Sequence, residues 1–171
     1  MKDRELNDVI SEISAGCTAL QRLDAYARWQ LTGDIETLGQ NETAAFAVAT
    51  MLENYYTAAE TVFFRISQQF GNALTPDRWH SDLLRKMKIE VPDLRPAVIS
   101  ETTYSLMDEL MRFRHFKRYY YQLQYDWPRL ENLLNVRERV HERLPDELIA
   151  FQQFVERLDT ADRAESPETG E

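Results

Sequence analysis

The densest group of chemically active side chains lies between residues 110 and 121, which read Leu-Met-Arg-Phe-Arg-His-Phe-Lys-Arg-Tyr-Tyr-Tyr. Guanidinium and ammonium groups bind phosphate, and phenol rings stack on nucleobases. The segment has neither glycine nor proline, and apolar residues precede it at helical spacing, so we expect a helix. Its candidate phosphate-binding residues are Arg112, Lys117 and Arg118, with Arg114 and His115 between them.

Neighbouring residues on a helix are separated by about 100°, which sorts this segment into two faces. One face is apolar and should pack against the core: Leu106, Leu110, Phe113, Phe116, Tyr120 and Leu123. The other carries a row of two arginines and two phenols: Arg114, Arg118, Tyr121 and Tyr125. This row either contacts the phosphates and bases of a nucleic acid or is an ordinary solvated cationic face with tyrosines at its edge.

The net charge of −9 is unevenly distributed along the chain. Residues 1–77 carry a net charge of −6, residues 78–118 carry +3, and residues 119–171 carry −6. An acidic surface repels nucleic acid, which argues against nonspecific binding by the whole surface. A phosphate-bearing ligand such as RNA would be attracted to the middle segment.

Apolar periodicity and short connections predict an all-α protein, an antiparallel bundle of four long helices plus one short helix. The expected helices are 3–31, 43–70, 78–88, 100–126 and 127–158. Local signals set these boundaries: the stop Thr32-Gly33-Asp34, an N-cap at Asn41 or Thr43, a start at Ser100, and Asp126 before Pro128. Pro145 should kink the last helix. Residues 1–158 then form one helical domain, and residues 159–171 form an acidic disordered tail.

Cys17 is the single cysteine, which excludes an internal disulfide and suits a small buried residue in a reducing compartment. The charged N-terminus is unlike a signal peptide, and the longest apolar-rich run, residues 44–52, is too short to span a bilayer. We therefore expect a cytoplasmic protein with no membrane contact. Nothing in the sequence indicates a cofactor.

The three histidines, His80, His115 and His141, are scattered along the chain and lack the spacing of a zinc-binding helix. Glu138 and His141 match the Glu-x-x-His spacing of a di-iron bundle, but the second copy is missing, so no metal is expected. Trp79 and His80 have two interpretations. They are core residues with a hydrogen-bonded imidazole, or they flank a cleft.

Three blocks in the middle of the chain resemble HepT-like proteins of the HEPN superfamily, over about residues 54–130. The blocks are Trp79-His80-x-x-Leu83-Leu84-x-x-Met87, Arg95-Pro96-x-Val98-Ile99-Ser100 and Phe113-Arg114-His115-x-x-Arg118-x-x-Tyr121. The resemblance implies a HEPN-like helical fold and a homodimer. It also implies a ribonuclease toxin that cuts its RNA substrate without metal and is paired with a nucleotidyltransferase antitoxin, MntA.

The motif of this family is an arginine followed, after four to six residues, by a histidine, often continuing as His-x-Tyr. Arg114 takes the arginine position and Tyr121 the final tyrosine, while Tyr119 stands where the histidine is expected. The resemblance implies that Arg114 steadies phosphate charge while a base removes the proton of the ribose 2′-hydroxyl. Tyr119 occupies the position of that base. His115 has a more suitable ring, but it points about 100° away from Arg114 around the helix.

The resemblance also implies that the antitoxin transfers AMP to Tyr121. The added phosphate would place negative charge beside Arg114 and Arg118 and occupy the path of the RNA. Because Tyr119 replaces the histidine, two other interpretations stay open. One is a non-catalytic HEPN protein that binds RNA, nucleotide or the antitoxin without cleavage. The other is a helical scaffold with no ligand.

Overall fold

The computed structural model describes residues 2–70, 79–120 and 125–165, and every long element in these ranges is a helix. The helices are α1 (Lys2–Gln30), α2 (Glu36–Leu38), α3 (Glu42–Gln69), α4 (Trp79–Met87), α5 (Glu101–Tyr120), α6 (Trp127–His141) and α7 (Leu144–Glu165). A π-helical turn, Leu31–Ile35, joins α1 to α2. The β pairing found in the described ranges is one isolated bridge between Val91 and Arg95. The predicted all-α fold is confirmed.

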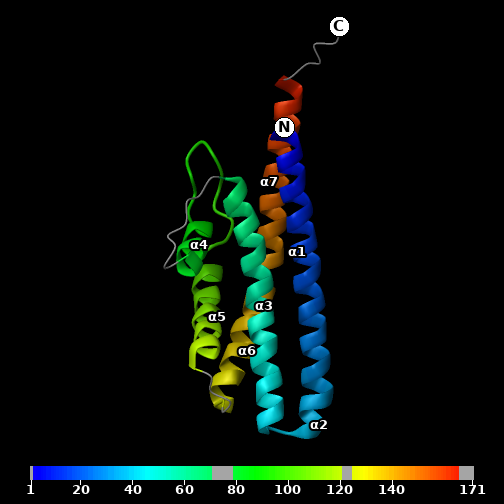
Figure 1. The fold of residues 1–171 in the computed structure, drawn as a ribbon. Helices are drawn as coiled ribbons and strands as arrows, with labels where there is room; N and C mark the ends of the chain where they lie inside the picture. Colours follow the sequence, from blue (N-terminus) through cyan, green and yellow to red (C-terminus); the bar gives the residue numbers. More distant parts are fainter. Residues whose placement is uncertain (1, 71–78, 121–124, 166–171) are drawn as a thin grey trace.

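The helix α3 is the centre of an elongated bundle (Figure 1). It packs against α1 on one side and against α4, α5 and α6 on the others, while α7 runs beside α1. The N-terminus and the end of α7 lie at one end of the bundle, and α2 lies at the other. Four helices therefore depend on the side chains of α3 for their packing.

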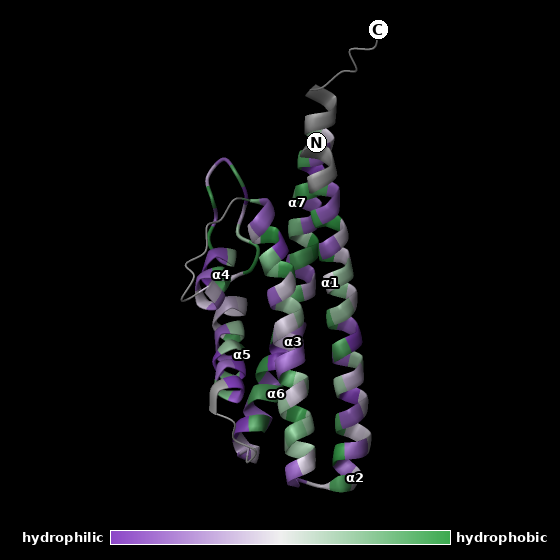
Figure 2. Cartoon of the chain, in the orientation of Figure 1, coloured by the Kyte–Doolittle hydropathy of each residue, from purple (hydrophilic) through white to green (hydrophobic). Residues whose placement is uncertain are grey.

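Apolar residues at helical spacing explain the central place of α3. Green apolar positions recur along α1 and α3 between purple polar ones (Figure 2). Tyr55, Tyr56 and Phe63 of α3 are each only 1% exposed. Gly16 of α1 lies so close to the side chain of Val62 that an added Cβ atom would collide with it, so the two helices approach closely there. Across the described ranges, no helix is both long enough and apolar enough to cross a bilayer.

Local capping sets the starts of three helices, as predicted. The side chains of Asn41, Ser100 and Asp126 each accept a hydrogen bond from the backbone N–H three residues later, at 2.9, 3.2 and 3.1 Å. The first turn of a helix leaves such N–H groups without an intrahelical partner, so each cap satisfies one of them.

The helix α1 ends at Gln30, within one residue of the predicted end, but the prediction that residues 32–34 stop the helical path is wrong. The chain passes through Thr32 to Asp34 as a π-helical turn, continues through α2 and turns at Gly39. Gly39 has a φ of +75°, a conformation that glycine adopts without the strain a Cβ would cause. Gly33 is the glycine that sequence reasoning favoured, and it lies inside the π-helical turn.

The predicted last helix is two helices. The break falls between α6 and α7, just before Pro145, which is the second residue of α7. At that position proline lacks only an N–H that would have no helical partner, so Pro145 begins a helix rather than bending one. The helix α7 runs to Glu165, past the predicted end at residue 158, through a segment that contains alanine, arginine and glutamate, which favour helix. Residues 166–171 lie outside the described part, so disorder there stays a prediction.

Candidate functional site

Arg114 is buried where α5 meets α3 and α4. The residue is 7% exposed, and its Nη2 lies 3.3 Å from Oε2 of Glu60 on α3. The guanidinium carbon lies 5.5 Å from the centre of the Tyr56 ring. The predicted surface row is therefore wrong for Arg114. The reason is that α5 packs against both α3 and α4, so its buried sector is wider than the single apolar stripe we expected.

His80 of α4 contacts the same carboxylate. Its Nδ1 lies 2.5 Å from Oε1 of Glu60 and 3.4 Å from Nη1 of Arg114. A carboxylate only accepts hydrogen bonds, so Nδ1 carries the proton and donates it to Glu60. The contact between His80 and Arg114 then joins two donors, which Glu60 holds together. We call Glu60, His80, Arg114 and Tyr56 the Glu60 cluster.

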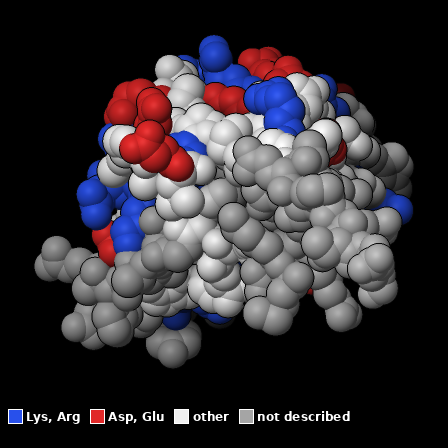
Figure 3. Space-filling model, turned by 90° about the horizontal axis from the view of Figure 1, so that it is seen from above, with Lys and Arg blue, Asp and Glu red and all other residues white. Residues whose placement is uncertain are grey.

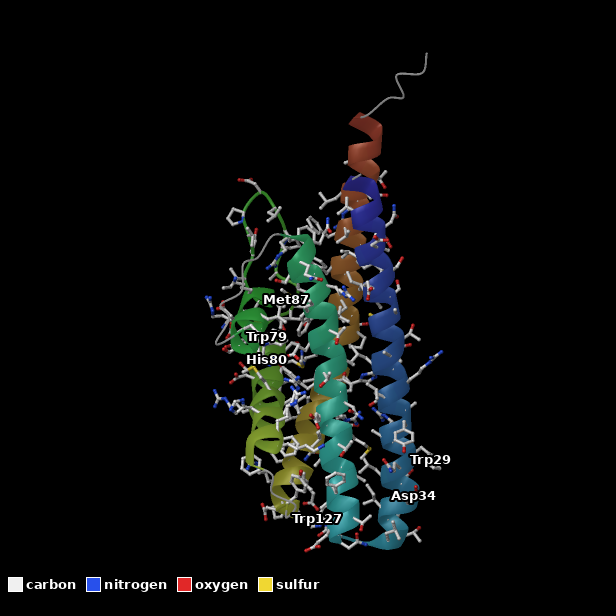
Figure 4. All side chains as sticks on the ribbon, viewed as in Figure 1. Trp29, Asp34, Trp79, His80, Met87 and Trp127 are labelled. Carbon is white, nitrogen blue, oxygen red and sulfur yellow. The ribbon has the colours of Figure 1, made fainter. Side chains whose placement is uncertain are left out.

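His80 has one feature expected from each of its two interpretations. The imidazole is hydrogen-bonded, as expected of a core histidine, but its side chain is 31% exposed, as expected beside a cleft. Figure 4 shows Trp79 and His80 together on α4, next to α5 and away from Trp127 at the start of α6. His80 is therefore the member of the cluster that solvent reaches most easily.

Tyr56 is the most deeply buried member of the cluster, at 1% exposure. Burial raises the pKa of its phenol well above the ordinary value, and the charge of Glu60 and the hydrogen bond to Glu60 raise it further. The hydroxyl therefore stays protonated and donates to Glu60. One carboxylate thus connects partners from α3, α4 and α5, which explains how Glu60 remains buried at 5% exposure.

A cavity of about 190 Å³ borders the cluster and is lined by Glu60, Thr61, Phe64, Arg65 and Trp79. The ring centres of Trp79 and His80 are 3.7 Å apart, and Phe64 packs edge-on against Trp79 at 6.0 Å. The side chain of Arg65 is 49% exposed. Cavities that enclose a whole small molecule measure roughly 300–1,000 Å³. This one suits one group of a larger ligand, with aromatic rings for a base and a guanidinium for phosphate.

The predicted phosphate-binding residues each form an ion pair with an acidic side chain. Lys117 is 12% exposed, and its Nζ lies 2.7 Å from Glu53. Arg118 is 54% exposed and lies 3.7 Å from the same carboxylate, while Arg112 is 75% exposed and lies 2.6 Å from Asp108. Cationic and acidic side chains are intermixed on the face seen in Figure 3. Phosphate binding by these three residues stays a prediction, and Arg112 and Arg118 are the more accessible.

The structure separates the other predicted site residues. His115 is exposed whereas its neighbour Arg114 is buried, so the two side chains leave α5 in different directions. Tyr119 belongs to the last turn of α5, but its side chain lies outside the described part of the chain, as does the whole of Tyr121. The roles of Tyr119 in catalysis and of Tyr121 as a modification site therefore stay predictions.

Sequence reasoning missed Glu60, although a signal for it exists. Glu60 follows Tyr56 by four residues and precedes Phe63 by three, so it falls on the buried face of α3. A carboxylate on an apolar stripe requires a buried hydrogen-bonding or charged partner. Such a residue is therefore a candidate site even when no motif contains it.

A second buried polar cluster joins α1, α3 and α6. Nη1 of Arg137 lies 2.5 Å from Oδ1 of Asp24, and Oδ2 of Asp24 accepts from Nε of Arg28 at 2.8 Å. His141 places Nε2 3.5 Å from Asp24 and Nδ1 3.0 Å from the hydroxyl of Tyr55. Tyr55 is only 1% exposed, so a substrate cannot reach this carboxylate–imidazole–hydroxyl series. We call Asp24, Arg137, His141 and Tyr55 the Asp24 cluster and assign it a structural role.

Charge and burial act on both titratable ends of the Asp24 cluster. Burial alone would raise the pKa of Asp24, but hydrogen bonds from Arg28 and Arg137, together with nearby positive charge, outweigh burial and lower the pKa. Burial lowers the pKa of His141, and the charge of Asp24 opposes this only in part. The folded protein therefore favours a charged Asp24 beside a neutral His141.

In the part of the chain that the structure describes, no three His, Cys, Asp or Glu side chains converge as a metal site requires.

Comparison with known proteins identifies the family. A family model described as HepT-like protein matches residues 47–155, more than half of the chain, and this range contains Glu60, His80 and Arg114. No curated protein and no solved structure matches. The match confirms the predicted resemblance: the chain belongs to the HepT-like protein family.

Proposed function

We propose that this protein is the toxin of a HepT/MntA-type toxin–antitoxin pair and that it cleaves RNA in the cytoplasm without a metal. The family suggests a ribonuclease-type component of such a pair. The observation that carries the proposal is the placement of the motif arginine, Arg114, in contact with an imidazole beside a cavity. Metal-independent cleavage needs a cation for phosphate charge and a ring that accepts a proton.

Arg114 has to exchange partners during the proposed reaction. At rest its Nη2 pairs with Glu60, while its Nε is buried without a hydrogen-bond partner among the described residues. A phosphate oxygen could take the guanidinium from Glu60, because a doubly bonded arginine–phosphate pair is strong and directional. We place the reaction in a cleft between two copies of the chain, where Arg112, Lys117 and Arg118 bind the RNA backbone.

A cell-based measurement tests cleavage. The unaltered protein, expressed without the antitoxin, should stop growth and fragment cellular RNA. Arg114→Lys should remove both effects, because lysine retains a positive charge for Glu60 but lacks the planar fork that binds phosphate. Arg85→Ala is the control, since Arg85 is exposed on α4 and pairs with Asp82. Intact RNA and normal growth with the unaltered protein would reject the ribonuclease proposal.

We further propose that the nucleotidyltransferase antitoxin silences the toxin by transferring AMP to Tyr121. The family pairing supports this step, and a phosphate added beside the cationic residues of α5 would neutralise them and compete with RNA for them. Mass spectrometry after incubation with the antitoxin and ATP would locate the adduct. Tyr121→Phe should lose it, whereas Tyr119→Phe and Tyr120→Phe should retain it. An adduct of unchanged amount in Tyr121→Phe would exclude this residue as the main acceptor.

The second candidate function is binding of RNA, nucleotide or the antitoxin without cleavage. Two observations favour it: Tyr119 stands in the histidine position, and Arg114 is already paired with Glu60. This candidate predicts that purified protein shifts RNA in a gel while the RNA stays intact. The same samples run on a denaturing gel separate the two candidates.

A further inference from the structure

We infer that His80, positioned by Glu60, is the base that removes the proton of the ribose 2′-hydroxyl, in place of the histidine that the motif lacks. The inference rests on the proposed ribonuclease function. It assigns the base to α4 rather than to α5, so the arginine and the histidine of the site come from different helices of one chain.

The geometry of His80 favours this role. Glu60 accepts the hydrogen of Nδ1 at 2.5 Å, which leaves the lone pair of the ring on Nε2. No side chain among the described residues bonds Nε2, and the His80 side chain is 31% exposed. A carboxylate behind an imidazole holds the ring in one orientation and stabilises the cation that forms when the ring takes a proton. Glu60 is therefore a positioning residue for His80.

Arg114 supplies the second group that the reaction requires, a cation that stabilises the charge of the phosphate. Its Nη1 is 3.4 Å from the imidazole of His80, so one ribose-phosphate unit could contact both side chains. Trp79 packs against the imidazole with their ring centres 3.7 Å apart, and with Phe64 and Arg65 it lines the adjacent cavity. The substrate that fits these groups is single-stranded RNA, with an unpaired base against the aromatic rings and its phosphate at the guanidinium.

The proposed step conserves atoms and charge. Nε2 of His80 takes the proton of the 2′-hydroxyl, the 2′-oxygen forms a bond to phosphorus, and the bond from phosphorus to the 5′-oxygen breaks. The leaving 5′-oxygen takes a proton from solvent, and the imidazolium of His80 releases its proton to solvent. The products are a 2′,3′-cyclic phosphate and a 5′-hydroxyl end, and the enzyme returns to its starting state.

The other two histidines are less suitable. His115 leaves α5 in a different direction from the buried guanidinium of Arg114. His141 belongs to the Asp24 cluster, where its Nδ1 faces the buried hydroxyl of Tyr55. His80 is the histidine whose contact with Arg114 the structure records.

The test measures steady-state cleavage of a fluorescent single-stranded RNA by the purified full-length protein. His80→Asn should lower kcat by about 100-fold or more, the usual contribution of a general base. Asparagine can still donate a hydrogen bond to Glu60 from the position of Nδ1, so the fold should persist, and thermal unfolding checks this. In case that variant is unfolded, His80→Ala is assayed with added imidazole, which should restore part of the activity. Arg85→Ala should cleave at the unaltered rate.

Glu60 needs a readout that a structural role would not change. Glu60→Gln should lower kcat, and its effect on kcat should be smaller in the His80→Asn background, because the part that acts through that imidazole is then already lost; the effect that remains reports its contact with Arg114. Mixed dimers of His80→Asn and Arg114→Lys subunits should stay inactive, since each chain lacks one half of the pair. Recovery of activity on mixing would overturn the assignment of both residues to one chain.

The outcomes separate this inference from the proposed function. Unaltered protein that leaves RNA intact overturns both. Unaltered protein that cleaves RNA, together with a folded His80→Asn variant within about threefold of its rate, overturns only the assignment of His80. Loss of activity in His115→Asn with retention in His80→Asn would likewise transfer the role to His115. Loss in His80→Asn, with recovery of His80→Ala activity by imidazole, supports the inference.

Discussion

The most quantitative prediction concerns Arg137 and the Asp24 cluster. The side chains of Arg137 and Asp24 are 3% and 10% exposed, and their charged atoms lie 2.5 Å apart. Removing one partner of a buried ion pair costs about 3–5 kcal/mol, because the other charge stays in a poorly solvated site. Arg28 also pairs with Asp24, so we expect the lower end of that range, about 3 kcal/mol, for Arg137→Met. Methionine retains much of the apolar stem of arginine, which keeps packing losses small.

The double variant gives the decisive comparison. Replacing both members of a buried ion pair by neutral groups is often neutral, because the desolvation of both charges is relieved together. We therefore expect Asp24→Asn with Arg137→Met to unfold within about 1 kcal/mol of the unaltered protein. The two single variants should each be less stable than the double variant. That ordering is the signature of coupling between the two charges.

Urea unfolding at pH 7, followed by circular dichroism, measures these free energies. A loss of about 3 kcal/mol also lowers Tm by roughly 6–12 °C in a protein of this size. Arg85→Met is the matched control, since its ion pair with Asp82 is 53% exposed on the arginine side and should contribute less than about 1 kcal/mol. A cost below about 1 kcal/mol for Arg137→Met, or a double variant as unstable as the sum of the singles, would refute the reasoning.

The remaining predictions concern pH and packing. Because the pKa of His141 is lowered from 6.5 and that of Asp24 from 3.8, the folded protein binds fewer protons than the unfolded chain. The free energy of unfolding should therefore fall as pH drops from 7 to 5, and it should fall further below pH 4. The loss between pH 7 and 5 should be smaller in His141→Gln. A free energy of unfolding that stays constant between pH 7 and 5 would contradict this prediction. Arg95 is 3% exposed and donates hydrogen bonds to three backbone carbonyls, those of Lys86, Ile89 and Pro96. Arg95→Met should therefore lower the free energy of unfolding in urea by about 2 kcal/mol. An unchanged urea midpoint would show that these bonds contribute nothing. Gly16→Ala should lower the free energy of unfolding by about 1–3 kcal/mol, because the added methyl group collides with Val62. Adding Val62→Ala should recover part of that loss. Equal stability of the single and double variants would exclude this contact as the cause.

Helices and their starts were predictable because they depend on residues close in sequence. The caps at Asn41, Ser100 and Asp126 each involve a backbone N–H only three residues away. The missed boundaries are also local, but there two signals compete. Gly33 and Gly39 both allow a stop, and only the positive φ of Gly39 shows which glycine the chain uses.

The candidate site was predicted only in part. Arg114 was named as a site residue from the family motif, and its role stays a prediction, but its exposure was predicted wrongly. Its guanidinium can be buried because the carboxylate of Glu60 compensates its charge, and Glu60 is far from it in sequence. His80 was left between two interpretations, since a single short helix does not reveal what packs against it.

The sequence by itself determined the all-α class, the apolar stripes, the helix caps and the motif that identifies the family. The sequence also contained a signal that our predictions did not use: Glu60 and Asp24 are carboxylates on otherwise apolar stripes, which indicates buried partners. Only the tertiary structure decided which charges meet there. Glu60 pairs with a histidine 20 residues away, and Asp24 with an arginine 113 residues away. Helix formation depends on interactions within about one turn, whereas these pairs depend on how whole helices pack around α3.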